Sequence, residues 1–190
     1  MQSSTDLQQF RRDFVKNFHR IGMNTTPGDA QFLRILIESS RAKNGLEIGV
    51  ATGYGAIVMG LGFERNKGRL TSIDIDAEMA AIARANVRKM ELHKTVTVVK
   101  GAALKVIPRL DDLFDFVFID AWKEEYLDYL RAVEPKLKPR AIIVADNVIQ
   151  FADETRDFLD AVGSDPACQS VVIRASEEKR DGMIVIYRKK

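Results

Sequence analysis

The stretch from Asn44 to Gly55 constrains the fold more than any other part of the chain. Its alternating apolar residues Leu46, Ile48 and Val50 are typical of a short buried strand, and the apolar residues 56–61 that follow are typical of a helix. Glycines lie between the two segments. Because glycine lacks a Cβ atom and tolerates positive φ, such a turn lets backbone amides approach a ligand closely. A strand, a glycine turn and a helix in this order predict an α/β domain with a ligand at the turn.

The spacing of the glycines distinguishes between classes of cofactor. Dinucleotide-binding folds carry Gly-x-Gly-x-x-Gly, so that a pyrophosphate lies on the helix N-terminus. Here the order is Glu47-x-Gly49-x-x-x-Gly53-x-Gly55, which argues against NAD. The acidic Glu47 disfavours a phosphate but suits the ammonium and sulfonium groups of S-adenosylmethionine. On this stretch alone, the competing interpretation is a tight strand-to-helix connection of any α/β protein.

Composition limits the classes of protein that fit the chain. Its 190 residues are 46% hydrophobic and 29% charged, as expected of one soluble globular domain. The net charge of only +2 makes nucleic acid a disfavoured partner. We find no apolar run of membrane-spanning length, no signal-peptide core and a single cysteine, Cys168. We therefore expect a cytoplasmic protein without a membrane partner.

Strand-like and helix-like segments alternate along the rest of the chain. The expected later strands are 70–74, 96–100, 116–120, 141–146, 171–174 and 183–187, and the expected helices are 6–21, 28–42, 78–90, 103–110, 124–133 and 153–162. This alternation predicts a mostly parallel, seven-stranded sheet with helices on both faces. Only residues 175–182 separate the last two strands, which should form an antiparallel hairpin. The helix expected over 6–21 is amphipathic and should pack on the domain or on a second subunit, as in a homodimer.

Polar residues at the strand ends form the candidate site, because ligands of parallel sheets bind at the carboxyl ends of the strands. These residues are Glu47, Asp74, Gly101, Asp120, Asp146 and Asn147. Asp74 can accept hydrogen bonds from both hydroxyls of a ribose. Asp120, Asp146 and Asn147 offer hard oxygen ligands that suit Mg²⁺. Any one of them could instead be a helix cap or a turn residue.

A lysine completes this set. Lys123 lies three residues after Asp120, at the entry to the next expected helix. Because a nearby divalent cation disfavours an ammonium group, Lys123 suits the role of a base that deprotonates an acceptor hydroxyl.

Together these residues resemble the cation-dependent class I O-methyltransferases of the catechol and caffeoyl-coenzyme A type. The matching segments, in order, are 46–54, 74–76, 100–104, 118–126 and 146–147. The resemblance extends over roughly residues 20–188. It implies a Rossmann-like class I methyltransferase fold in a single domain, residues 1–190. Residues 1–26 would form an N-terminal helix and a loop that closes over the cofactor, and residues 27–190 would form the core.

The resemblance also implies roles for individual residues. Lys123 would be the catalytic base, and Asp120, Asp146 and Asn147 would hold Mg²⁺ or another divalent cation. The cofactor S-adenosylmethionine would be bound by Met23, Asn24, Thr25, Glu47, Gly49, Thr52, Gly53, Tyr54, Gly55, Asp74, Ile75, Gly101, Ala102, Ala103, Asp120 and Trp122. The implied reaction is a direct methyl transfer to one of two neighbouring hydroxyls of a small, catechol-like aromatic substrate.

Two departures from the family leave the acceptor open. Members that act on coenzyme A esters carry a longer insertion after the Asp-Asn pair, whereas here only residues 148–152 precede the next helical segment, so we expect an open acceptor pocket. Catechol-type enzymes carry a glutamate near the last hairpin. The simplest match places Ala175 there, with Glu177 and Glu178 close by. The alternatives are methylation of a hydroxylated uridine in transfer RNA, a non-catalytic S-adenosylmethionine-binding domain and, last, a dehydrogenase.

Overall fold

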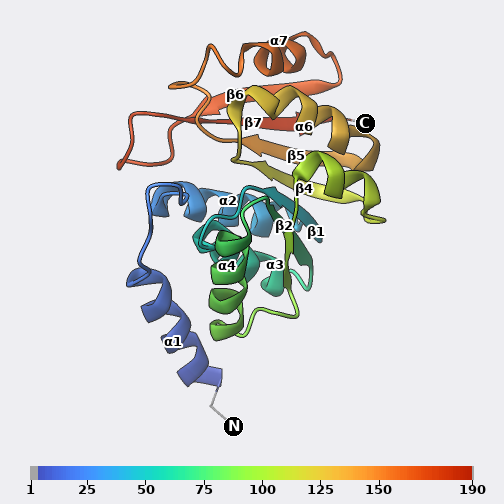
Figure 1. Cartoon of the computed structure of the whole chain (residues 1–190). Helices are drawn as coiled ribbons and strands as arrows, with labels where there is room; N and C mark the ends of the chain where they lie inside the picture. Colours follow the sequence, from blue (N-terminus) through green and yellow to red (C-terminus); the bar gives the residue numbers. More distant parts are fainter. Residues whose placement is uncertain (1–3, 190) are drawn as a thin grey trace.

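A seven-stranded sheet in the order β3-β2-β1-β4-β5-β7-β6 runs through the molecule (Figure 1). The computed structural model describes residues 4–189. The strands are β1 Asn44–Ile48, β2 Arg69–Asp74, β3 Val96–Lys100, β4 Phe114–Ile119, β5 Leu137–Ala145, β6 Cys168–Ile173 and β7 Met183–Arg188. The first five are parallel, and β7 runs antiparallel to both β5 and β6. The predicted mostly parallel sheet with a C-terminal hairpin is therefore confirmed.

Helices cover both faces of this sheet. They are α1 Ser4–Lys16, α2 Pro27–Ser40, α3 Tyr54–Arg65, α4 Ala77–Lys89, α5 Ala103–Val106, α6 Tyr126–Val133 and α7 Arg156–Ser164. One apolar cluster joins α2, α3 and α4 to one face, and a second joins α5, α6 and α7 to the other. Helix α1 projects from the rest of the domain (Figure 1). None of the helices within residues 4–189 has the length and hydropathy needed to cross a lipid bilayer.

Helix α7 begins three residues later than predicted, and three other helices differ from the prediction for local reasons. Helix α1 ends at Lys16 because the side chain of Asn17 donates to the carbonyl of Asp13 (2.9 Å). Phe18 nevertheless continues the apolar stripe by packing on Phe14. The helix expected over 103–110 tightens into a 3₁₀ turn, Ile107–Arg109, at a proline that has no amide hydrogen to donate. The helix expected over 124–133 opens with another 3₁₀ turn, Lys123–Glu125.

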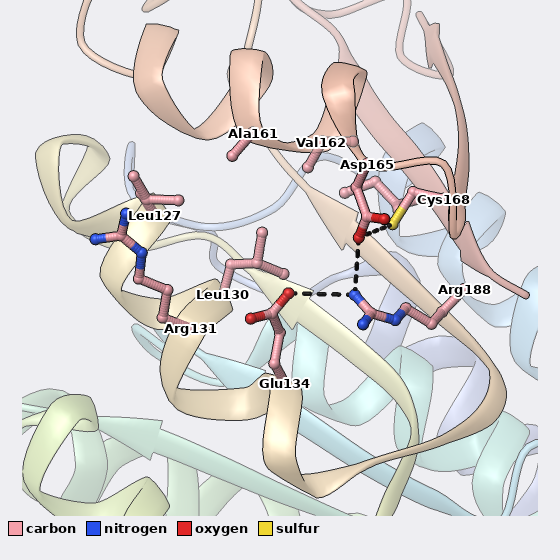
Figure 2. A pocket seen from close by; sticks show the side chains of 10 residues that line it. Leu127, Leu130, Arg131, Glu134, Ala161, Val162, Asp165, Cys168 and Arg188 are labelled. Carbon is pink, nitrogen blue, oxygen red and sulfur yellow. Dashed lines mark hydrogen bonds and ion pairs between the residues drawn. The ribbon is translucent and has the colours of Figure 1, made fainter. Parts of the chain in front are cut away.

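A cavity of about 110 Å³ lies between α6, α7 and the hairpin β6–β7 (Figure 2). The guanidinium of Arg188 forms ion pairs there with Glu134 and Asp165, both at 3.2 Å. Cys168 begins β6 and Arg188 ends β7, so the cavity lies at the edge of the sheet opposite the carboxyl ends of the parallel strands. It contains none of the residues that the sequence places in the candidate site.

Candidate active site

The register of the central strands brings the candidate site residues to one edge of the sheet. Ile48, Ile119 and Ala145 are partners across β1, β4 and β5. The ladder extends one residue further, since the amide of Asp120 donates to Ile48 (2.9 Å) and that of Asp146 donates to Ile119 (3.0 Å). Both carboxylates therefore leave neighbouring strands at the same level.

The glycine turn is held in place by Asp74. Its Oδ2 atom accepts hydrogen bonds from the amides of Val50 (3.0 Å) and Ala51 (2.9 Å), and its Oδ1 atom accepts one from the amide of Asp76 (2.9 Å). Gly49 has φ +93°, and a Cβ atom there would lie 2.0 Å from the carbonyl oxygen of Asp120. Glycine at this position thus permits the close contact between the loops that leave β1 and β4.

Glu47 is buried beside the turn. Its Oε2 atom has no hydrogen-bond partner among the described residues, and its Oε1 atom lies against Gly55, where a Cβ atom would be 3.0 Å away. Burial, together with the negative charges of Asp120 and Asp74, raises the pKa of Glu47 to about 8, although the side chain of Ser72 opposes the rise. A cationic group of a ligand beside the unpaired oxygen would lower this pKa again and so favour the ionised carboxylate.

This shifted pKa predicts how the stability of the ligand-free protein depends on pH. The folded state holds the Glu47 proton up to about pH 8, whereas the unfolded chain releases it near 4.5, so the contribution of Glu47 falls as pH rises between these values. The full cost above pH 8 is up to about 5 kcal/mol. In thermal unfolding, Glu47→Gln should therefore gain Tm relative to wild type between pH 5 and 8. Glu124→Gln, a control at an exposed position, should show no such gain in Tm. A difference in Tm between Glu47→Gln and wild type that stays constant with pH would contradict the raised pKa of Glu47.

The N-terminal segment is fastened to the glycine turn. Oδ1 of Asn24 accepts hydrogen bonds from the hydroxyl of Thr52 (2.7 Å) and the amide of Ile21 (2.9 Å). Thr25 is buried, and its hydroxyl lies 3.0 Å from the position that a Cβ atom on Gly55 would occupy. Residues 21–25 therefore lie next to the glycine turn.

Three predicted cofactor residues are large apolar side chains that face solvent. The side chains of Met23, Ile75 and Trp122 are 65%, 70% and 67% exposed. Met23 belongs to the N-terminal segment, and Ile75 and Trp122 follow the carboxyl ends of β2 and β4. Large apolar side chains that are exposed at this edge offer surface that a ligand can cover. Their exposure is consistent with contacts to an adenosyl group.

The remaining predicted cofactor residues differ in what they contact. Residues 101–103 connect β3 to α5, and the amide of Gly101 donates to the carbonyl of Asp74 (2.8 Å), which brings this connection to the second strand end. The ring of Tyr54 instead packs on Phe18, with centroids 5.2 Å apart. The side chain of Tyr54 therefore supports the N-terminal segment.

Lys123 is held between a carboxylate and a phenol. Its ammonium donates to Oδ1 of Asp120 (3.0 Å) and to the hydroxyl of Tyr126 (2.8 Å). The hydroxyl of the buried Tyr126 in turn donates to the carbonyl of Asp146 (3.0 Å). Tyr126 thereby links the ends of β4 and β5 and fixes the position of the lysine, a role that the sequence analysis missed.

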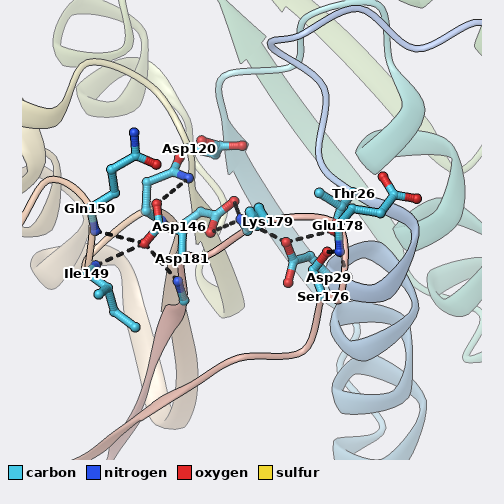
Figure 3. Close-up of polar contacts among 12 residues, drawn as sticks. Thr26, Asp29, Asp120, Asp146, Ile149, Gln150, Ser176, Glu178, Lys179 and Asp181 are labelled. Atoms are coloured by element: carbon cyan, nitrogen blue, oxygen red, sulfur yellow. Dashed lines mark hydrogen bonds and ion pairs between the residues drawn. The ribbon is translucent and has the colours of Figure 1, made fainter.

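Asn147 is oriented by a residue from the last hairpin. Its Nδ2 atom donates to Oδ2 of Asp181 (3.0 Å), so its carbonyl oxygen is left for another partner. Oδ1 of Asp181 accepts from the amides of Ile149 (3.0 Å), Gln150 (3.0 Å) and Gly182 (2.7 Å) (Figure 3). Asp181 thus joins the loop after β5 to the start of β7.

Lys179 is the second cation of the site, and the sequence analysis did not anticipate it. Its Nζ atom lies 2.6 Å from both carboxylate oxygens of Asp146 and 2.8 Å from Oδ2 of Asp29 (Figure 3). Burial raises the pKa of Asp146, Asp120 raises it further, and Lys179 opposes both effects. The one signal in the sequence was the expected hairpin, whose 175–182 loop follows β6 at this edge of the sheet, but nothing in the sequence singled out Lys179 among the charges of that loop.

Comparisons with known proteins place this geometry in a family. A family profile described as O-methyltransferase matches residues 1–168. The chain belongs to this family. A catechol O-methyltransferase of Niastella koreensis is 34% identical over 151 residues, which are 77% of this chain and 66% of that protein. Caffeoyl-CoA O-methyltransferase 2 of Petunia hybrida is 31% identical over 133 residues, which are 67% of this chain and 54% of that protein.

The solved structures include the same fold. Cofactor-bound Rv0187 from MTB matches with a TM-score of 0.85 at 25% identity, and the match covers 97% of this chain and 90% of that chain. The resemblance to the catechol and caffeoyl-CoA O-methyltransferases is therefore confirmed. The two curated relatives are longer proteins, and the match spans 66% of the first and 54% of the second.

Proposed function

We propose that the protein transfers a methyl group from S-adenosylmethionine to a hydroxyl oxygen of a small, catechol-like acceptor, with the help of Mg²⁺. The observation that carries the proposal is the buried Glu47 carboxylate, which has an unpaired oxygen beside the glycine turn. This carboxylate suits the ammonium group at the methionine end of the cofactor. Membership in the O-methyltransferase family and the relative named as a catechol O-methyltransferase support the same reaction.

The cofactor would extend along the edge of the sheet from Glu47 toward Asp74. The three amides that hold Asp74 fix its carboxylate, and the remaining lone pair on Oδ1 can accept a ribose hydroxyl. Ile75 and Trp122 would then cover the adenine, and Met23 would close over the cofactor from the N-terminal segment.

We expect Asp74→Ala to weaken the binding of S-adenosylhomocysteine by at least about tenfold, because a charge-assisted hydrogen bond to the ribose would be lost. Asp76→Ala, which removes the cap of α4 but leaves the strand-end carboxylate, is the matched control. Isothermal titration calorimetry measures both affinities. Binding by Asp74→Ala as tight as that of wild type would remove Asp74 from the cofactor site.

The donor set at the ends of β4 and β5 fits a divalent cation. Within residues 4–189 no three His, Cys, Asp or Glu side chains are grouped to hold a metal, so Asp120 and Asp146 need the amide oxygen of Asn147 as a third ligand. Asp181 orients that amide through its nitrogen, which leaves the oxygen for this purpose. When bound, the cation would lower the pKa of the acceptor hydroxyl and hold a second hydroxyl beside it.

Lys123 would supply the base. In its neutral form it would accept the proton of the acceptor hydroxyl, while Asp120 and Tyr126 keep its nitrogen at the ends of β4 and β5. The oxygen then attacks the methyl carbon, the carbon–sulfur bond breaks, and its electron pair remains on the sulfur of S-adenosylhomocysteine. Holding both reactants in line avoids a bimolecular entropy cost of roughly 7 to 11 kcal/mol in favourable cases.

A methylation assay tests this function directly. Methyl-labelled S-adenosylmethionine is supplied with catechols, hydroxycinnamoyl esters or bulk transfer RNA, in Mg²⁺ and in chelator. We expect the catechols to become labelled, and only in the reactions that contain Mg²⁺. Labelled transfer RNA would support the alternative acceptor, and cofactor binding without transfer to any acceptor in this panel would contradict the proposal.

A further inference from the structure

Lys179 joins two buried carboxylates that belong to distant parts of the chain. Asp29 lies in the first turn of α2 and Asp146 follows β5, and both are almost completely shielded from solvent. The ammonium of Lys179 is within 2.8 Å of Asp29 and within 2.6 Å of both oxygens of Asp146. Carboxylates that are shielded from water need a nearby positive charge to offset the hydration that they have lost. In this structure Lys179 supplies that charge.

The loop that carries Lys179 is built against the N-terminal part of the domain. A Cβ atom on Gly28 would lie 2.4 Å from the carbonyl oxygen of Ala175, so the loop passes directly over the start of α2. Glu178 forms an ion pair with Arg20 (2.9 Å), and its amide donates to Ser176 (3.1 Å). Lys179 is thus positioned by its whole loop and not by Asp146 alone.

This position conflicts with a divalent cation on Asp146. A cation bound to that carboxylate would lie a few ångströms from an ammonium that already contacts both carboxylate oxygens. At a separation of about 4 Å, a divalent cation and an ammonium repel each other strongly even under the screening typical of protein sites. The divalent cation and the Asp146–Lys179 ion pair therefore compete.

Asp29 gives the displaced lysine an alternative partner. Its Oδ1 atom has no hydrogen-bond partner within the described part of the chain, while its Oδ2 atom already contacts Lys179. An ammonium that leaves Asp146 can move toward this free oxygen and remain paired. The cost of displacing Lys179 is reduced in this way.

We propose that Lys179 occupies the cation position of Asp146 when no divalent cation is bound, and that the divalent cation binds by transferring Lys179 to Asp29. This inference rests on the proposed function, because it assumes that Asp146 is a metal ligand. Lys179 would then set the affinity of the site for the cation, and cation binding would change the contacts of the 175–182 loop.

Binding of Mn²⁺, followed by the electron paramagnetic resonance signal of the free ion in the presence of S-adenosylhomocysteine, tests the inference without turnover. Lys179→Met should bind Mn²⁺ at least about tenfold more tightly than Arg180→Met, an exposed neighbour that loses the same charge. Equal affinity of these two variants would overturn the inference.

A second variant keeps the lysine and so does not depend on how well Lys179→Met folds. Asp29→Asn removes the alternative partner and should weaken Mn²⁺ binding several-fold, whereas tighter or unchanged binding would overturn the inference. The results also distinguish a failure of this inference from a failure of the proposed function. Equal Mn²⁺ affinity in all variants overturns only the competition by Lys179. An absence of Mn²⁺ binding in wild type and Lys179→Met, with normal cofactor binding, overturns it together with the metal requirement of the proposed function.

Discussion

Methyl transfer is expected to fall by at least about a thousandfold when Asp146 is replaced by alanine, while the affinity for S-adenosylhomocysteine changes little. A divalent cation contributes several kcal/mol of charge stabilisation at the reacting oxygen, and each 1.4 kcal/mol or so is a factor of ten in rate. Asp146 faces Lys179 and the amide of Asn147 and not the glycine turn. Single-turnover rates with labelled cofactor and calorimetry with S-adenosylhomocysteine measure the two effects separately.

Asp146→Ala should lower the free energy of unfolding by less than the removal of one partner of a buried ion pair usually does. Lys179 keeps Asp29 as a partner, so no lone buried cation remains after Asp146 is removed. Asp128→Ala is the matched control, because Asp128 is exposed on α6 and its contact with Arg131 is long, at 3.9 Å. Wild-type activity that persists in chelator, or a variant that retains its rate, would show that the end of β5 is structural.

The sequence was sufficient to predict the sheet and the edge at which its polar residues meet. Both depend on periodicity along the chain: Leu46 and Ile48 alternate with polar residues in β1, and the parallel order places Asp120 beside Asp146. Helix ends were less accurate, since they depend on single contacts such as the hydrogen bond of Asn17 to Asp13.

The second half of the site could not be predicted in the same way. Lys179, Asp29 and Asp181 meet Asp146 and Asn147 through a loop whose path depends on packing over α2. Neither the spacing of these residues nor their type distinguishes them from solvent-exposed charges on a hairpin. Tyr126 was missed for a related reason: its hydroxyl group is directed at a backbone carbonyl 20 residues away in sequence. Long-range contacts of this kind require the three-dimensional fold.

Replacement of Lys123 by alanine should lower kcat at neutral pH by at least about a hundredfold, which is the lower end of the effect of a general base. The cofactor should bind as before, because the lysine contacts Asp120 and Tyr126. As pH rises, the rate of the variant should recover in part, since a growing fraction of the acceptor hydroxyl ionises without assistance. Rates measured from pH 6 to pH 10 with saturating cofactor provide the test.

Two further variants separate a base from a residue that only holds the site together. Lys105→Ala, an exposed lysine on α5, controls for the loss of one positive charge. Tyr126→Phe keeps the ring but removes the hydroxyl that receives the Lys123 hydrogen bond, so its kcat should fall less than that of Lys123→Ala and its pH profile should keep the wild-type shape. If Lys123 only holds the site together, the rate lost in Lys123→Ala and the rate lost in Tyr126→Phe should each stay constant across the pH range. A loss that shrinks with rising pH in Lys123→Ala alone is the signature of a missing base.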